Sequence, residues 1–238
     1  MMAKGLRISV ALEDSSKAIE LLGEKDAKFK ETITLGNFPV GLIEYVPIEH
    51  ALEPVRGNGS LFINCMWVLR PFWRHGVARA LVQRAVEMGK NYGGVSILAY
   101  DGDKWLGGYA YLPAAQFRKM GFKDVDRDGS RVLLHLNTGS NEKPELVHPQ
   151  CKKYKGSGKP VVDIYFNSQC LWSGWSADEV RRNIGKYKVE ANFINTDDRQ
   201  VVLERGLSRG VCINGEPLVK RIAPWWEIEP LIRKAIRD

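Results

Sequence analysis

The sequence predicts a mixed α/β protein made of two successive parts, and three observations support this fold class. Short apolar segments of strand length alternate with segments of helical periodicity along most of the chain. A polar stretch rich in Gly, Ser and Lys separates the two parts between about residues 137 and 160. Apolar residues make up 44% of the chain and charged residues 26%, which is typical of a globular protein and excludes wholesale disorder.

The sequence of the first part predicts a helix, a strand pair and then alternating strands and helices. The expected elements are a helix over 16–22, strands over 29–35 and 39–46 turned at Gly36-Asn37, a strand over 61–69, a helix from Gly76 to Met88 closed by Gly89, a strand over 94–100, a short helix over 114–120 and a strand over 132–137. In the longer helix, Val77, Leu81, Ala85 and Met88 recur at helical spacing and predict its buried face.

The second part predicts the order strand, helix, strand, helix, strand, helix. The expected elements are a strand over 161–166, a helix opened by a capping box at Ser176-Ala177-Asp178-Glu179 and ended by Gly185, a strand over 189–194, a helix over 199–205, a strand over 210–213 and a helix over 226–236. Asn214-Gly215 is a strong hairpin signal after the last strand.

Charge and hydropathy exclude several functional classes. The net charge of +7 is divided between the two parts, with 18 Lys/Arg against 15 Asp/Glu in residues 1–140 and 17 against 13 in residues 141–238. Because no basic stripe or tail results, we expect no nucleic-acid partner. Apolar runs are too short to span a bilayer, and the N-terminus lacks a secretory leader, so we expect a cytoplasmic protein without a membrane partner.

The four cysteines are widely scattered and form no C-x-x-C pair. We therefore expect neither a disulfide framework nor a metal site. Cys212 lies in an apolar strand and is expected in the core, whereas Cys151 in the polar stretch is expected to be exposed. Cys65 is open to two interpretations, a nucleophile that carries an acyl group or a buried core thiol, and its strand position favours the core thiol.

The most informative segment is 65–81, in which an apolar strand runs into a tight turn that opens a helix. Small residues at Gly76 and Ala78 let backbone amides approach a ligand, and a helix N-terminus directs N–H groups and positive potential toward an anion. Arg74, His75 and Arg79 add cationic side chains, so a pyrophosphate fits this turn. The alternative is an ordinary strand–loop–helix connection with solvated arginines. Neither G-x-G-x-x-G nor G-K-[ST] is present.

This segment resembles the acetyl-CoA-binding motif of GNAT acetyltransferases, Gln/Arg-x-x-Gly-x-Gly/Ala. Gly76 and Ala78 match the motif, Trp73 stands at its first position, and the stretches 41–47 and 117–122 resemble two further GNAT segments. The resemblance implies a GNAT-type mixed sheet with splayed central strands over 1–140 and acetyl-CoA as the acyl donor. The donor-binding residues that it implies are Met66, Trp67, Val68, Leu69, Trp73, Arg74, His75, Gly76, Val77, Ala78 and Arg79.

The resemblance also implies direct attack of a primary amine on the thioester. Glu44 is the first candidate for the general base and Glu49 the second. Phe117 stands where the family often has a proton-donating Tyr, so the acid would be Tyr111 or Tyr109, or water, or the thiolate would leave unassisted. Trp67 and Trp73 would line the acceptor side or simply pack.

The second part resembles the thioredoxin-like extension of YoaP-like GNAT proteins, which implies a smaller α/β domain over 160–238 after a linker over 141–159. Cys170 follows the first strand as a candidate catalytic thiol, in the form Cys170-Leu171-Trp172-Ser173 without a resolving cysteine. Arg209 occupies the position of the family's cis-proline. These features favour a single-thiol role, or a non-catalytic module that shapes the acceptor site or an interface.

Taken with the resemblance, these features predict an acetyl-CoA-dependent N-acetyltransferase acting on a small-molecule or peptide amine. The alternative is a non-catalytic acyl-CoA-binding or regulatory protein, which the loss of the tyrosine hydroxyl at Phe117 favours. The sequence specifies neither the amine nor the oligomeric state.

Overall fold

The computed structural model describes residues 6–10, 29–35, 38–102, 104–105, 109–110, 112–139, 143–154 and 158–237. They fall into two compact units, each with its own hydrophobic core. The first unit groups Met1–Ala51, Val55–Asp103 and Ala110–Leu146, and the second groups Leu52–Pro54, Lys104–Tyr109 and Val147–Asp238. The helix expected over 16–22 lies outside the described residues.

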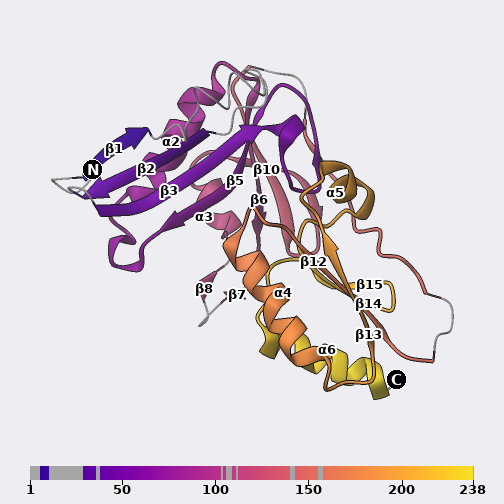
Figure 1. Ribbon diagram of the computed structural model, residues 1–238. Coiled ribbons are helices and arrows are strands. Elements are labelled where there is room, and N and C mark those ends of the chain that lie inside the picture. The colour runs from indigo at the N-terminus through magenta and orange to yellow at the C-terminus, as the bar shows by residue number, and fades with distance from the viewer. Residues whose placement is uncertain are drawn as a thin grey trace. The chain divides into compact units, whose positions relative to one another are not determined.

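The first unit is built on a seven-stranded mixed sheet with the order β1-β2-β3-β5-β6-β10-β9 (Figure 1). Its strands are β1 (Leu6–Val10), β2 (Phe29–Leu35), β3 (Phe38–Pro47), β5 (Leu61–Val68), β6 (Gly94–Tyr100), β9 (Lys123–Asp128) and β10 (Arg131–Asn137). Neighbouring strands are antiparallel except β5 and β6, which are parallel. The strands predicted for this part are confirmed. β9 was not predicted, because its sequence Lys-Asp-Val-Asp-Arg-Asp has no apolar alternation.

Helix α2 (Val77–Gly89) packs on this sheet, and its predicted buried face is confirmed at Val77, Leu81 and Ala85. Gly41 of β3 is required here, because a Cβ at that position would lie 2.8 Å from Cγ1 of Val77. The shorter elements of the chain are η2 (Ile48–His50), η3 (Arg70–Phe72), α3 (Ala114–Arg118), the pair β4 (Val55–Arg56) and β11 (Glu145–Leu146), and the pair β7 (Lys104–Trp105) and β8 (Tyr109–Ala110).

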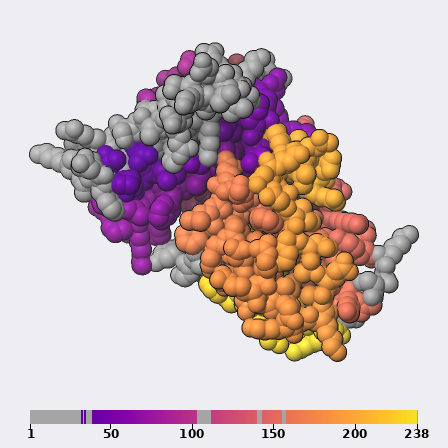
Figure 2. Space-filling view, viewed as in Figure 1, coloured from indigo at the N-terminus to yellow at the C-terminus, as the bar shows by residue number. Residues whose placement is uncertain are grey.

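The second unit contains a four-stranded sheet with the order β13-β12-β14-β15. Its elements are β12 (Val161–Phe166), α4 (Leu171–Ile184), β13 (Glu190–Asn195), α5 (Arg199–Arg205), β14 (Gly210–Ile213), β15 (Glu216–Val219) and α6 (Trp225–Arg237). Strands β12 and β13 are parallel and the other pairs antiparallel. The predicted hairpin is confirmed, with positive φ at Asn214 (53°) and Gly215 (82°). On the face seen in Figure 2, the orange segments of this unit form a continuous packed surface.

The predicted start of the first helix in the second unit is wrong. Helix α4 begins at Leu171 with Cys170 as its N-cap, so the Ser176–Glu179 pattern lies inside the helix. The Ser176 hydroxyl donates instead to the carbonyl of Ala223, 2.5 Å away, and Ser176 is buried. A tertiary contact therefore uses the hydroxyl that the local pattern assigned to capping. The predicted end at Gly185 is confirmed.

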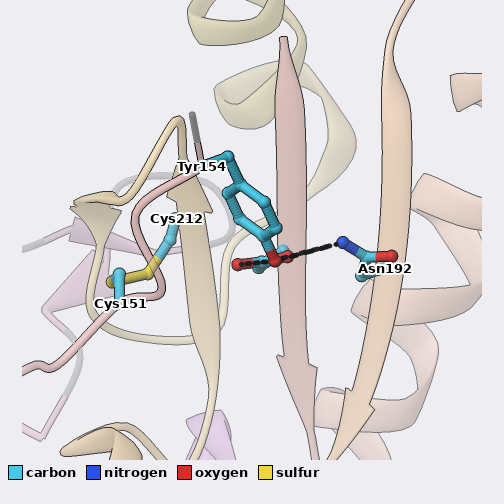
Figure 3. Close-up of a disulfide and its surroundings, with 5 residues drawn as sticks. Cys151, Tyr154, Asn192 and Cys212 are labelled. Carbon is cyan, nitrogen blue, oxygen red and sulfur yellow. Dashed lines mark hydrogen bonds between the residues drawn. A yellow bond between two sulfur atoms is a disulfide. The ribbon is translucent and has the colours of Figure 1, made fainter. Parts of the chain in front are cut away.

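The expectation that the cysteines form no disulfide is also wrong, and so is the expected exposure of Cys151. Cys151 and Cys212 form a disulfide across 61 positions of sequence, with their Cα atoms 6.3 Å apart (Figure 3). Cys212 is in the core as expected, but Cys151 is half-buried and packs with Tyr165 and Leu207 rather than lying exposed. Such a pairing cannot be read from widely spaced cysteines, because the tertiary fold alone brings them together.

Candidate functional site

The central feature of the first unit is a fork between the parallel strands β5 and β6. Their register covers only Leu61–Ile63 of β5, paired with Val95–Ile97 of β6. On its other side β5 stays paired with β3 as far as Val68. Among the described strands, β5 therefore has no register partner on its β6 side beyond Ile63. An extended ligand can pair with backbone groups along such an edge.

A β-bulge lies at the same place. The register between β3 and β5 shifts from Glu44 opposite Cys65 to Tyr45 opposite Ile63, which leaves Asn64 as the extra residue. Bulges re-aim side chains and interrupt pairing, and they are over-represented next to active sites. The first candidate base, Glu44, is half-buried on the strand beside this irregularity. Glu49, the second candidate, accepts a hydrogen bond from the amide of Gly59 at 2.7 Å.

The predicted phosphate turn follows β5 directly. The amide of Leu69 donates to the carbonyl of Val40 (2.9 Å), and the indole N–H of Trp73 donates to the carbonyl of Val68 (2.7 Å). These two bonds attach the turn to the ends of β3 and β5. Arg74 takes a left-handed conformation with φ of 65°, which reverses the chain before the helix.

Gly76 is the N-cap of α2 and has φ of 82°, a conformation that favours glycine. The first bond within the helix runs from the amide of Ala80 to the carbonyl of Gly76 at 2.9 Å. The amides of Val77, Ala78 and Arg79 come before this bond, so they are the N–H groups that a helix start leaves for another acceptor. They lie at the positive end of the helix dipole, where an anion is stabilised.

The side chains in and around the turn differ in solvent exposure. Arg74, His75 and Arg79 are exposed, as a contact with a charged ligand requires, whereas Val77 belongs to the core. Trp67 and Trp73 keep 52% and 40% of their surface accessible, which is unusual for tryptophan in a folded unit. The remaining predicted donor-binding residues are half-buried or buried: Met66, Val68, Leu69, Gly76 and Ala78. The structure thus brings all the predicted donor-binding residues onto one strand, its following turn and one helix start.

The proton donor is not located by the structure. Tyr111 lies outside the described residues, and so does the side chain of Tyr109. Phe117 lies on α3 and is fully buried, in edge-on contact with Phe122 at 5.7 Å between ring centroids. Its ring therefore serves the core of the first unit.

Cys170 belongs to the second unit, where it is the N-cap of α4 and half-buried. Its amide donates to Oδ1 of Asn167 at 3.2 Å, and the amide of Asn167 donates to the hydroxyl of Ser173 at 3.1 Å. Among the described residues no peptide bond is cis, and Arg209 is buried. The loop before α4 is held by these bonds and by the carboxylate of Asp197, which accepts from the amide of Ser168 at 2.7 Å.

Sequence reasoning missed a polar cluster beside the disulfide, in which Asp163 is buried and Tyr154 and Asn192 are half-buried (Figure 3). The hydroxyl of Tyr154 donates to the carboxylate of Asp163 at 2.9 Å, and Nδ2 of Asn192 donates to the same carboxylate oxygen at 2.9 Å. Burial and the neighbouring Asp163 raise the pKa of Tyr154. The signal in the sequence was Asp163, a charged residue in the otherwise apolar strand 161–166. Because its carboxylate is satisfied by neighbours within the unit, the cluster fits a structural role.

The described residues contain no group of three or more His, Cys, Asp or Glu side chains placed to hold a metal ion. Within the same residues, no helix is both long and apolar enough to cross a membrane.

Comparison with known proteins finds a match for the segment that holds the fork and the turn. Residues 16–105 match the model of the acetyltransferase (GNAT) family. The chain is also similar to the uncharacterized N-acetyltransferase YoaP of Bacillus subtilis (strain 168), with 24% identity over 159 residues, 66% of this chain. The matched region spans 62% of the length of that relative.

Solved structures resemble the chain along slightly more than half of its length. A GNAT family acetyltransferase from Elizabethkingia anophelis with acetyl-CoA bound is 13% identical, with a TM-score of 0.38, and covers 57% of this chain and 99% of its own. An IAA acetyltransferase from Bacillus cereus is 12% identical, with a TM-score of 0.38, and covers 56% of this chain and 99% of its own.

Proposed function

We propose that the GNAT segment at residues 16–105 is the catalytic part of an acetyl-CoA-dependent N-acetyltransferase. The observation that carries the proposal is the continuity of the fork and the phosphate turn. Strand β5 leaves β6 after Ile63 and runs directly into a turn whose glycine N-cap, Gly76, opens helix α2. A ligand with a diphosphate at one end and an extended amide-bearing arm at the other matches both features.

The two parts of such a ligand would contact different groups. The diphosphate of acetyl-CoA would accept hydrogen bonds from the amides of Val77, Ala78 and Arg79, with Arg74 and His75 beside it. The arm would then run along the open edge of β5 from Val68 toward Asn64. This path would place the thioester at the bulge, next to Glu44. Acetyl-CoA supplies an activated acetyl group with a thiolate as leaving group.

For the transfer we propose Glu44 as the base that takes a proton from the ammonium of the acceptor. Its half-buried carboxylate lies on the strand next to the bulge, where the thioester would be placed. Phe117 has no proton to donate, so Tyr111 is proposed as the acid for the departing thiolate. The acceptor would be a primary amine of a small molecule or a peptide.

For the second unit we propose a thioredoxin-like module over residues 160–238, joined by a linker over 141–159 to a GNAT domain over 1–140. The chain order β12-α4-β13-α5-β14-β15-α6 and the sheet order β13-β12-β14-β15 support this proposal. Cys170 at the start of α4 would be the candidate reactive thiol of the module. Ser173 stands where a resolving cysteine would be needed for dithiol chemistry. We therefore expect a single-thiol role for Cys170, or a non-catalytic module.

Calorimetric titration of acetyl-CoA tests the donor site. The variant Gly76→Asp places a carboxylate among the amides proposed for the diphosphate, so we expect its affinity to fall at least about tenfold. Gly129→Asp is the matched control, because it adds the same charge at a turn glycine that also has positive φ (62°) in the β9–β10 hairpin. Equal affinity in Gly76→Asp and the control would refute the phosphate assignment. Binding of acetyl-CoA without CoA release in the presence of an amine library would favour the non-catalytic alternative.

A further inference from the structure

Asn64 occupies the point at which the bulge and the fork of the first unit coincide. It is the residue of β5 that is skipped in the register with β3, and the register with β6 ends one residue earlier, at Ile63. Among the described strands, its position therefore has no pairing partner on either side. The position lies at the end of the open edge of β5 that is farthest from the phosphate turn.

The side chain of Asn64 is buried, with 9% of its surface exposed, yet among the residues that the structure describes neither Oδ1 nor Nδ2 has a hydrogen-bond partner. A buried carboxamide normally has partners, because an unsatisfied polar group loses its hydrogen bonds to water without replacement. Asn167 in the second unit shows the usual case. It is fully buried, its Oδ1 accepts from the amide of Cys170, and its Nδ2 donates to the carbonyl of Ser208. Asn64 has an available donor and an available acceptor side by side.

We propose that the Asn64 carboxamide binds the reacting acyl group and the incoming amine, an inference that rests on the proposed function. Its Nδ2 donates a hydrogen bond to the carbonyl oxygen of the thioester, and its Oδ1 accepts an N–H of the amine. Both roles follow from the position, because an arm held at the turn and extended along β5 ends at Asn64. A carboxamide is matched to this pair of groups, since one offers an acceptor and the other a donor.

During transfer the lone pair of the amine nitrogen forms the bond to the carbonyl carbon, and the π pair moves onto the oxygen that Nδ2 contacts. The π bond then re-forms, the C–S bond breaks and the sulfur leaves with its electron pair. Glu44 takes the first proton, from the ammonium before attack, and the second proton of the nitrogen passes to the departing sulfur through the acid proposed above. The hydrogen bond from Nδ2 strengthens as negative charge develops on the oxygen, so Asn64 acts as a catalytic residue in this scheme.

The test compares the affinities of acetyl-CoA and CoA, which differ by the acetyl group alone. In the wild type we expect acetyl-CoA to bind more tightly. In Asn64→Leu, which has similar volume but no polar atom, we expect this preference to fall about fivefold, the equivalent of one ordinary hydrogen bond. Asn64→Asp keeps the shape and lacks the donor, so it should lose the preference to the same extent while CoA itself still binds.

Thermal unfolding without ligand separates this role from a structural one. Because the Asn64 carboxamide has no hydrogen-bond partner within the described part of the chain, Asn64→Leu should melt no lower than the wild type. Asn167→Leu should melt lower, because it removes existing bonds. The proposal is overturned if either Asn64 variant keeps the wild-type ratio of the two affinities, or if Asn64→Leu melts markedly lower. Failure of the wild type to bind either nucleotide would instead overturn the proposed function itself, and this inference with it.

Discussion

Glu53 and Arg209 form a buried ion pair although 156 positions of sequence separate them. A second oxygen of the same carboxylate accepts a hydrogen bond from the hydroxyl of Ser208 at 2.6 Å. Glu53 lies in Leu52–Pro54, the three-residue segment from the first half of the sequence that belongs to the second unit. A residue from a loop in the first half of the sequence thus stabilises the segment that leads into β14.

Glu53→Gln should destabilise the second unit strongly. The substitution removes the negative charge beside the buried guanidinium of Arg209, and loss of one partner of a buried ion pair typically costs about 3 kcal/mol or more. Urea unfolding followed by circular dichroism measures the effect. The matched control is Asp178→Asn, which breaks an exposed pair with Arg181 on α4 and should leave the unfolding free energy almost unchanged. Equal effects in the two variants would contradict the prediction.

Loss of the disulfide should also destabilise the second unit. A crosslink over 61 positions restricts the unfolded chain, so Cys151→Ser should lower the unfolding free energy by roughly 2–4 kcal/mol under oxidising conditions. Reductant should lower the stability of the wild type to a similar extent and have no further effect on the variant. Titration of four free thiols in the denatured, unreduced protein would show that the bond does not form.

The stability of the first unit should fall on mild acidification because of His135. Burial lowers the pKa of this histidine below the ordinary value of 6.5, and its Nδ1 lies 2.9 Å from the hydroxyl of Ser96. As the pH falls from 6.5 toward the lowered value, the unfolded state gains a proton that the folded state does not bind. The unfolding free energy therefore decreases over that interval and is highest above it.

The measurement is urea unfolding of the ligand-free protein at several pH values between 7.5 and 5. His135→Gln should show a flatter pH dependence than the wild type. His75→Gln, at an exposed histidine, should retain the slope of the wild type. If His135→Gln leaves the slope of the unfolding free energy against pH unchanged, groups other than His135 cause the pH dependence.

Glu44→Gln should reduce acetyl transfer without changing the affinity for acetyl-CoA. Removal of a general base typically costs about 100-fold or more in rate, because the ammonium then keeps its proton. The measurement is CoA release with the most active amine of a library, together with calorimetry of acetyl-CoA binding. Glu87→Gln, on the exposed side of α2 and paired with Arg84, is the control for loss of a carboxylate. Full turnover in Glu44→Gln would exclude this residue as the base.

Most of the secondary structure could be predicted locally. Strands 94–100 and 161–166 and helix 199–205 were predicted at the bounds that the structure shows, because their periodicity or their boundary residues are strong. The charged strand β9 was missed because its pairing with β10, rather than its own residues, makes it a strand. The capping box predicted at Ser176 is wrong for a related reason, because the Ser176 hydroxyl donates a hydrogen bond to the distant carbonyl of Ala223.

By itself the sequence determined the turn that opens α2, because Gly76 and its cationic neighbours are adjacent in the chain and their conformation is local. Only the tertiary structure decided the disulfide partner of Cys151, the ion pair of Glu53 with Arg209, and the isolation of Asn64 at the fork. Each of these depends on segments distant in sequence. The free energy that brings such segments together comes from burial summed over a whole unit, which no local pattern records.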